Sequence, residues 1–477
     1  MSASGQINTY PAVEGIPLSD AFVVKARLAG TEDDWTIVVA YSVDVADVNT
    51  TQNEFNRYPI AVASLDVSGP VEIKVEYTTS KIETATVRPV SLGVKTSVEN
   101  GQTIFFTLEK RTDVMVEING DKWKALHVLV NEVETGAPTG DADGLWYFGP
   151  GLNNGSAFSK VIDGNLMVPS DTTVYLAGGA FLNAKLNFKG VSNASVRGHG
   201  FIWNGPNGGA ILIERSTNTL VEGVTSLGAT GFSLTTGEAK GVHVKGYRSF
   251  SSHGNGDGVD FFCSRDVLVE DCFLRNSDDT VAIYGHRWDY HGDTADITIR
   301  NCTLLPDIAH AVMIGTHGSP ARPETFRNIR VENIDILDHY ENQLWYQGCI
   351  SVNAADENLI EDVRVEDVRV EKISKGQLVN IRTMQNAMWT TAPGRGVRNV
   401  TFKNVELDMD NSKIVNPSQI LGYDGSRKVE NVTFVNLKIG GELVHDGMKK
   451  PRWYMVSDFV PMFVNEHVDN VKFILED

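Results

Sequence analysis

The sequence predicts an all-β protein in which an N-terminal β-sandwich is followed by a parallel β-helix. Three observations support this fold class: short apolar runs rich in Val, Ile and Phe, 44 glycines, and a short motif that recurs through the later part of the 477-residue chain. β-Branched and aromatic residues favour strands, and glycine favours turns. We expect a β-sandwich domain at residues 1–135, a connection at 136–156 and a β-helix domain at 157–477.

The first 135 residues contain segments in which polar and apolar side chains alternate. Examples are AFVVKARL (21–28), WTIVVAYSVDV (35–45) and PVEIKVEYTT (70–79), each ended by turn-forming residues. Irregular spacing between such segments is typical of an antiparallel sandwich. The stretch ETGAPTGDADGLWYFGPGLNNGS (134–156) is dense in Gly, Pro, Asp and Asn. It interrupts the alternation and therefore indicates a connection between two domains.

A motif of the form apolar-x-(Gly/Asp/Asn) recurs in the second part of the chain, for example as VRGHGF, VEDCFL and FKNVEL. Successive copies lie 23 to 37 residues apart, a period that indicates a solenoid. Gly, Asn and Asp tolerate left-handed backbone angles, so we expect each coil to turn at the third motif residue. Coils made of strands and tight turns stack into a parallel β-helix. The expected turn residues are Gly198, Gly223, Gly246, Asp271, Asn301, Asn333, Asp367, Asn404 and Asn436.

Three aspartates are separated by about one repeat. Asp257 is followed after 21 residues by the adjacent pair Asp278 and Asp279. Residues one coil apart lie above one another in a β-helix, so the three carboxylates are expected to form one patch. Like charges in close proximity raise at least one pKa, which lets one carboxyl group act as an acid while another acts as a base. We predict that these residues are catalytic; the alternative is a solvated turn on a passive solenoid.

Residues near these acids are candidates for the rest of the site. His310 lies on the coil after the pair and is predicted to be catalytic with it, whereas Asp260 and Asp271 are assigned to turns or strand ladders. Two insertions, YGHRWDYHGD (284–293) and DHYENQLWYQGC (338–349), supply flat rings that can stack on a sugar or, alternatively, cover the solenoid face. The predicted substrate-binding residues are His253, Asn255, Trp288, Tyr290, His317, Trp345 and Tyr346.

Charge and cysteine content exclude several classes of partner. The formal net charge is -19, from 61 acidic and 42 basic residues, which argues against nucleic acid and anionic membranes. The four cysteines are too sparse for a disulfide scaffold or a zinc cluster, and we expect no metal and no cofactor. No apolar run or leader is recognisable, which predicts a cytoplasmic protein or a secreted mature form without its leader. A monomer or weak oligomer is expected.

Three segments resemble the motifs of glycoside hydrolase family 28, the polygalacturonase family. NGDGVD (255–260), SDDTVA (277–282) and AHAVMIGT (309–316) are similar to its NTDGID, DDC-V-A and GHG-x-S-I-G-S motifs, in the same order. The resemblance implies a right-handed parallel β-helix, with Asp278 as general acid, Asp257 and Asp279 activating water, and His310 supporting them. It also implies hydrolysis with inversion, for which the carboxyl groups are usually about 6.5–9.5 Å apart.

The sequence departs from this family where a galacturonate carboxylate would be bound. The resemblance implies an Arg-x-Lys about 33 residues after His310, where this chain has Gln343-Leu344-Trp345. Arg382, in VNIRTM, is a candidate replacement from another coil. The two-domain layout is also similar to glycoside hydrolase family 49, the dextranases and isopullulanases, whose α-glucan substrates are neutral.

The predicted function is therefore inverting hydrolysis of a poly- or oligosaccharide by three aspartates. A neutral α-glucan of the dextran type is the expected substrate, and a pectin-type substrate, as for a polygalacturonase, is the alternative. A Ca²⁺-dependent polysaccharide lyase would need an Arg or Lys base among the acids, and none is present there. A non-catalytic glycan-binding solenoid would retain affinity for its ligand without turnover.

Overall fold

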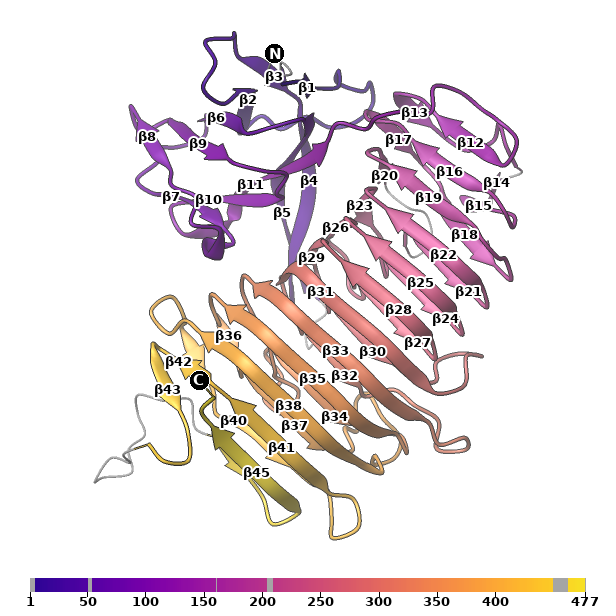
Figure 1. Ribbon diagram of the computed structural model, residues 1–477, viewed down its shortest axis with the longest axis vertical. Coiled ribbons are helices and arrows are strands. Elements are labelled where there is room, and N and C mark those ends of the chain that lie inside the picture. Colours follow the sequence, from indigo (N-terminus) through magenta and orange to yellow (C-terminus); the bar gives the residue numbers. More distant parts are fainter. Residues whose placement is uncertain (1–4, 50–53, 160, 204–208, 449–461, 477) are drawn as a thin grey trace.

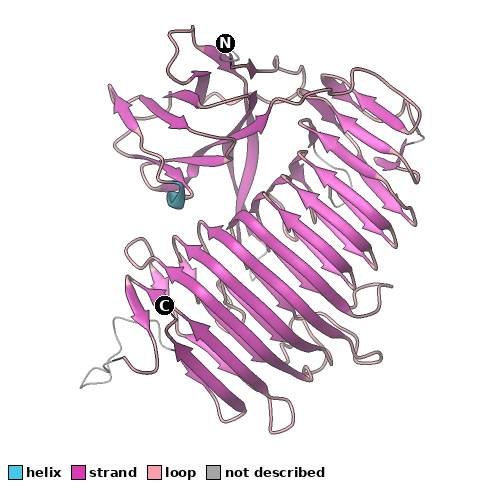
Figure 2. Ribbon diagram, in the orientation of Figure 1, coloured by secondary structure: helices cyan, strands magenta, loops and turns pink. Residues whose placement is uncertain are grey.

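The computed structural model describes residues 5–49, 54–159, 161–203, 209–448 and 462–476. The regular secondary structure of the described chain consists of strands and one short 3₁₀ turn at Val90–Leu92, joined by loops (Figure 2). An N-terminal pair of sheets lies against the side of a long stack of parallel coils (Figure 1). This confirms the predicted fold class, a β-sandwich followed by a right-handed parallel β-helix. The described part of the chain has no helix long and apolar enough to span a bilayer.

The sandwich consists of two sheets around one apolar core. Alternating polar and apolar side chains produce this core. In β6 (Val71–Tyr77), for example, every second residue is buried between the sheets. An antiparallel sandwich was expected, but the first, six-stranded sheet is mixed. Its strand β11 (Asp121–Glu132) pairs in parallel with β5 (Glu54–Val67). The other strands of this six-stranded sheet are β1 (Ile7–Asn8), β4 (Ala40–Asn49), β7 (Ala85–Arg88) and β10 (Val114–Ile118). The second sheet contains β2 (Phe22–Leu28), β3 (Thr36–Val38), β6, β8 (Ser97–Glu99) and β9 (Thr103–Leu108).

The β-helix has one broad sheet of 20 strands and one narrower sheet of 12 strands. Each middle coil contributes two strands, or one long bent strand, to the broad sheet and one strand to the narrower sheet. The broad sheet contains β12 (Leu145–Phe148), β13 (Gly151–Asn153), β16 (Thr173–Leu176), β17 (Ala180–Leu182), β19 (Ser195–Gly198), β20 (Phe201–Trp203), β22 (Thr217–Glu222), β23 (Thr225–Ala229), β25 (Lys240–Lys245), β26 (Arg248–Ser251), β28 (Arg265–Glu270), β29 (Phe273–Asn276), β31 (Thr294–Pro306), β33 (Thr325–Ile336), β35 (Leu359–Val370), β38 (Gly396–Leu407), β41 (Val429–Val435), β42 (Leu437–Ile439), β43 (Glu442–Val444) and β45 (Val468–Ile474).

The narrower sheet carries the residues discussed below. Its strands are β14 (Val161–Ile162), β15 (Asn165–Met167), β18 (Lys185–Lys189), β21 (Ile211–Glu214), β24 (Leu234–Gly237), β27 (Val259–Phe262), β30 (Val281–Tyr284), β32 (Val312–Gly315), β34 (Ile350–Ala354), β37 (Val379–Thr383), β40 (Ser418–Leu421) and β44 (Met462–Val464). A separate pair joins β36 (Lys375–Gly376) to β39 (Ile414–Val415). Inward-facing Val, Ile, Leu and Phe residues from both sheets form one continuous core along the β-helix.

The turns of the β-helix occur at the residues expected from the repeat. All nine third motif residues, from Gly198 to Asn436, have positive φ angles. Their side chains also form a ladder, in which Asn333 Nδ2 donates to Asn301 Oδ1 (2.9 Å) and Asn301 Nδ2 donates to Asp271 Oδ1 (3.3 Å). Asn and Asp therefore satisfy the turn conformation and bond adjacent coils to each other.

The division of the chain into domains stays a prediction. β12 and β13 lie inside the segment 136–156 that was expected to be a connection, and they pair in parallel with β16 and β17. The last described strand of the sandwich, β11, ends at Glu132. We propose that the connection is limited to the residues between Glu132 and Leu145, because the first coil begins at β12.

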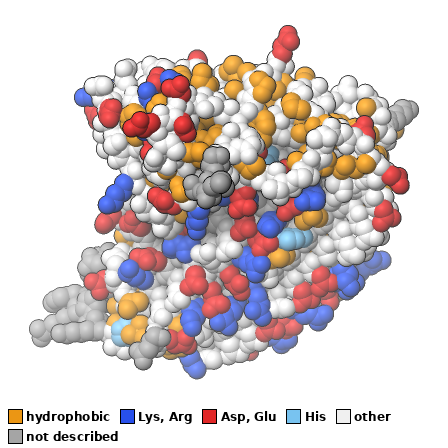
Figure 3. Space-filling model, turned by 45° about the horizontal axis from the view of Figure 1, so that its top comes forward, with side chains coloured by type: hydrophobic (Ala, Val, Ile, Leu, Met, Phe, Trp, Pro, Cys, Tyr) orange, Lys and Arg blue, Asp and Glu red, His pale blue; other side chains and the backbone are white. Residues whose placement is uncertain are grey.

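The sandwich is attached to the β-helix by apolar contacts and by buried ion pairs. Val43 and Val45 of β4 pack in one cluster with Phe250, Phe273 and Leu305 of successive coils. Buried cations bridge the two parts as well: Arg248 of β26 pairs with Asp113, Arg88 with Glu371, and Lys122 with Asp307 and Asp338. On the face seen in Figure 3, acidic and basic side chains are interspersed over the β-helix.

Candidate active site

The three aspartates converge because they occupy equivalent positions on neighbouring coils. Asp257 precedes β27, and Asp278 and Asp279 lie between β29 and β30. Val259 of β27 is in register with Val281 of β30, which places Asp257 beside Asp279. One carboxylate oxygen from each of the three lies within 4.8 Å of the others. Asp257 and Asp279 are buried, and Asp278 is half-buried.

This spacing is shorter than the separation that inversion was expected to require. The 4.8 Å limit joins the nearest oxygens, whereas two-carboxylate inverting sites usually have about 6.5–9.5 Å between carboxyl groups. A water with two tetrahedral hydrogen bonds of about 2.8 Å joins oxygens about 4.6 Å apart. Oxygens within 4.8 Å of one another are close enough for one water molecule to bridge two of them.

Asp278 and Asp279 are adjacent in sequence, but their pKa values are shifted in opposite directions. Burial, and then the neighbouring Asp279, raise the pKa of Asp278 to about 7. Burial alone would also raise the pKa of Asp279, but His310 and Tyr284 lower it below its usual value. Tyr284 donates its hydroxyl to Asp279 Oδ2 (2.7 Å), and the His310 backbone N–H donates to Oδ1 (2.9 Å). Asp278 can hold a proton near neutral pH while Asp279 remains ionised.

His310 is arranged to act as a cation. Its Nδ1 lies 2.7 Å from Asp279 Oδ1, and its Nε2 lies 2.6 Å from the carbonyl oxygen of Tyr346. Both partners can only accept, so both ring nitrogens must donate, which requires the imidazolium form. Burial alone would lower the pKa of His310, but Asp279 raises it above its ordinary value. The ring of Tyr346 packs edge-on against it at 4.7 Å.

Two further residues belong to the cluster and were missed from the sequence. Asp260 was assigned to a turn or ladder, yet it is fully buried, and neither of its carboxylate oxygens has a hydrogen-bond partner among the described residues. Burial, followed by Asp279 and Asp278, raises its pKa well above the ordinary value. Its position in NGDGVD could have indicated this role. Tyr284 ends an ordinary apolar strand, and no sequence signal distinguishes it.

The predicted sugar-binding residues on the loops differ widely in exposure. Trp288 and Trp345 are 59% and 65% exposed, and the Arg287 guanidinium lies over the Trp288 ring at 5.4 Å. Tyr290 and Tyr346 are buried, because Tyr290 packs beneath Trp288 and Tyr346 packs against His310. The structure therefore gives Tyr346 a supporting position behind the acids and not an open stacking face.

The polar members of the predicted set differ in how they contact the cluster. The Asn255 backbone N–H donates to Asp278 Oδ2 (3.2 Å), and His253 lies in the same loop. His317 accepts from Arg287 Nη1 (2.8 Å), and its ring packs edge-on against Tyr284. Burial, and then Arg287, lower the pKa of His317 to about 3, so His317 is neutral.

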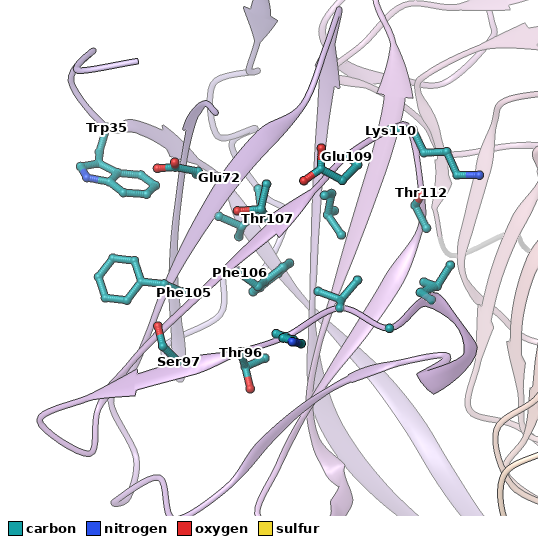
Figure 4. Close-up of a pocket in the computed structure, with 16 residues that line it drawn as sticks. Trp35, Glu72, Thr96, Ser97, Phe105, Phe106, Thr107, Glu109, Lys110 and Thr112 are labelled. Atoms are coloured by element: carbon teal, nitrogen blue, oxygen red, sulfur yellow. The ribbon is translucent and has the colours of Figure 1, made fainter. Parts of the chain in front are cut away.

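A separate groove lies on the sandwich, away from the acids. It has a volume of about 620 Å³ and is formed by the second sheet of the sandwich together with the segment after the 3₁₀ turn. Trp35, Phe105 and Glu72 lie along it (Figure 4). None of the clustered aspartates lines this groove, so the chemistry of the site does not depend on it.

The pH dependence of activity follows from Asp278. If Asp278 donates a proton to the leaving group, kcat/KM should fall as the pH rises through about 7, because the carboxyl group then loses that proton. The apparent pKa of this basic limb belongs to the interacting carboxyl groups together and not to one isolated group. A pH profile of kcat/KM checks this, and activity that stays constant well above pH 7 would contradict it.

The fold and the cluster define a class of protein, a parallel β-helix with an N-terminal β-sandwich and three clustered aspartates on neighbouring coils. Comparison with known proteins gives the family. The model of glycosyl hydrolases family 28 matches residues 173–451, more than half of the chain. The chain belongs to this family, whose members are O-glycosyl hydrolases.

Individual relatives match shorter stretches. The polygalacturonase of Chamaecyparis obtusa is 27% identical over 131 residues, which are 27% of this chain and 24% of the relative. The polygalacturonase of Juniperus ashei is 31% identical over 111 residues, 23% of this chain and 20% of the relative. Among solved structures, Dex49A from Penicillium minioluteum has a TM-score of 0.60 at 14% identity and covers 96% of both chains. This last similarity concerns the fold of both domains.

Proposed function

We propose that this protein hydrolyses a galacturonate-containing polysaccharide with inversion, using Asp278 as general acid and Asp279 as general base. One observation carries the proposal: two adjacent carboxyl groups, clustered with Asp257, have pKa values displaced in opposite directions. That separation is what an acid and a base need in order to work at the same pH. The family match and the polygalacturonase relatives support the reaction class and the substrate.

The roles within the cluster follow from the hydrogen bonds. Asp278 protonates the glycosidic oxygen as the bond to the leaving sugar breaks. Asp279, held ionised by His310 and Tyr284, removes a proton from the water that attacks the anomeric carbon. Asp257 has one buried oxygen without a partner among the described residues, so we assign it to orient this water. Burial, and then Asp260 and Asp278, raise the pKa of Asp257 well above its ordinary value, which disfavours it as the base.

Arg382 supports an acidic substrate. Its Nη1 donates to the carbonyl oxygen of Trp345 (2.5 Å), so the guanidinium lies against the segment 343–345 that lacks the family's Arg-x-Lys. Its buried Nε has no hydrogen-bond partner among the described residues. An available guanidinium can bind a carboxylate through two N–H groups. A neutral α-glucan is the second candidate, favoured by the exposed apolar side chains of Leu344 and Trp345.

A substrate screen tests the proposal. Wild-type protein and the Asp278→Asn variant are incubated with polygalacturonate, dextran and pullulan in the presence of EDTA, and new reducing ends are measured. We expect release from polygalacturonate by the wild type alone. Release from dextran or pullulan only would favour the neutral substrate. A parallel incubation with Ca²⁺ in place of EDTA covers the lyase, which would form unsaturated products there and none with EDTA. No turnover with retained binding in either assay would indicate a glycan-binding protein.

The role of Arg382 gives a separate prediction. Arg382→Gln should raise KM for polygalacturonate by about 10- to 100-fold, because a charge-assisted hydrogen bond contributes about 1.5–3 kcal/mol. Arg398→Gln is the matched control, since Arg398 is exposed and pairs with Glu361 on the broad sheet. Steady-state kinetics of both variants provide the measurement. Equal KM values for the two variants would exclude Arg382 as a carboxylate ligand.

A further inference from the structure

The strands β4 and β5 extend beyond the sandwich toward the acids. Residues 43–49 and 54–60, here called the arm, pair only with each other on the described strands, because the pairing of β5 with β11 begins at Ala61. Figure 1 shows this ribbon reaching the middle of the β-helix. A two-stranded ribbon is marginally stable in water, so it depends on packing against another surface.

One side of the arm packs beside His310. Ala46 and Val48 form a small apolar cluster with Ile308, Ala309 and the partly buried Tyr340. Ala309 directly precedes His310, and its backbone N–H donates to the carbonyl oxygen of Tyr340 (2.9 Å). The arm therefore contacts the segment that holds the cation of the cluster.

The other strand of the arm contacts the loop that leads to Asp257. Arg57 Nε donates to the carbonyl oxygen of Ser252 (3.2 Å). The ring of Phe55 lies against Gly254, because a Cβ placed on Gly254 would be 3.1 Å from two ring atoms. Gly254 does not have a left-handed backbone, and a side chain there would have to displace the Phe55 ring by a few tenths of an ångström. Phe55 is nevertheless 37% exposed, so its substitution removes contact to this loop with little loss of core.

The same loop is bonded to the general acid. The backbone N–H of Asn255, the residue after Gly254, donates to Asp278 Oδ2 (3.2 Å). Ser277, the residue before Asp278, donates its hydroxyl to the carbonyl oxygen of His253 (2.6 Å). A displacement of residues 252–255 would therefore move a hydrogen-bond donor away from Asp278.

We propose that the arm is a positioning element of the active site, in which Phe55 and Arg57 hold the loop 252–255 so that Asn255 orients Asp278. The sandwich thereby takes part in catalysis through contacts to this loop, beyond covering the side of the β-helix. The inference rests on the proposed function, since it assumes that Asp278 is the acid.

The test compares Phe55→Ala, Arg57→Gln and the double variant with the wild type of the full chain. We expect kcat on the substrate identified in the screen to fall by about 10- to 100-fold in the double variant, with KM nearly unchanged, because misplacing a reacting group by about 1 Å has this effect. Phe55→Leu should restore most of the loss caused by Phe55→Ala. The neighbouring carboxylates Asp257, Asp279 and Glu341 favour the protonated form of Asp278, whereas the Asn255 donor favours the ionised form. Loss of this donor should therefore raise the pKa of Asp278 and move the basic limb of the pH profile upward.

Controls separate this inference from the function itself. Arg27→Gln removes a half-buried arginine of β2 that pairs with Glu72 of the adjacent strand β6, in the sandwich sheet that does not carry the arm, and kcat should not change. Turnover by the wild type and its loss in Asp278→Asn establish the function independently. With that function established, an unchanged kcat in Arg57→Gln and in the double variant would overturn the proposal. A change confined to KM would also overturn it, because the arm would then bind substrate without positioning the acid.

Discussion

Replacement of Asp278 by Asn is expected to lower kcat by about 10²- to 10⁴-fold, the usual contribution of a general acid. The amide has nearly the same volume as the carboxyl group and can still accept from the Asn255 N–H, so the cluster should keep its shape. It cannot, however, transfer a proton to the glycosidic oxygen. Initial rates of reducing-end release, compared with the wild type, provide the measurement.

A second aspartate provides the control for this substitution. Asp266 is an exposed residue that forms a long ion pair with Lys240 on the broad sheet. It has a positive φ, which Asn also tolerates. Asp266→Asn should therefore retain the wild-type rate. If Asp278→Asn kept a rate within tenfold of the wild type, Asp278 would not be the general acid.

Replacement of Arg248 by Met is expected to destabilise the protein by about 3–5 kcal/mol, the cost of breaking one partner out of a buried ion pair. Arg248 is 1% exposed, its Nε donates to Asp113 Oδ2 (2.7 Å), and its Nη1 donates to Asn131 Oδ1 (2.7 Å). Both partners lie on the sandwich, whereas Arg248 lies on β26. Methionine would fill part of the volume but would leave the Asp113 carboxylate without its cation.

Urea denaturation followed by tryptophan fluorescence measures this effect. Arg364→Met is the matched control, because Arg364 is exposed and pairs with Glu366 at the surface, where an ion pair contributes about 0–1 kcal/mol. The Arg248 variant should lose much more stability than this control. Equal losses in the free energy of unfolding would mean that the buried ion pair between the sandwich and the β-helix contributes no more stability than a surface pair.

The sequence predicted the β-helix in some detail because its signal is local and repeated. Nine Gly, Asn and Asp residues were expected at left-handed turns, and all nine have positive φ angles. The 21-residue step from Asp257 to Asp278 likewise matched one coil, so the proximity of the acids followed from the period.

Features that depend on contacts between distant residues could not be predicted in this way. The parallel pairing of β5 with β11 and the contact of Phe55 with Gly254 arise only when the sheets and domains pack together. The exposure of loop aromatics was equally hidden, since Trp345 is exposed and the adjacent Tyr346 is buried. Asp260 was assigned to a turn or a strand ladder; it lies on the paired strand β27, but its place in the acidic cluster could not be foreseen, because its burial depends on neighbouring coils.

The anomeric configuration of the first product tests the central claim most directly. The nearest oxygens of the three acids lie within 4.8 Å, a distance that suits one bridging water and is also close to the separation of about 5–5.5 Å in retaining enzymes. Proton NMR of the newly formed reducing end, recorded before mutarotation, distinguishes inversion from retention of the anomeric configuration. We predict inversion, with the first product in the opposite configuration to the cleaved bond. Retention would contradict the account, because an aspartate would then act as the nucleophile in place of water.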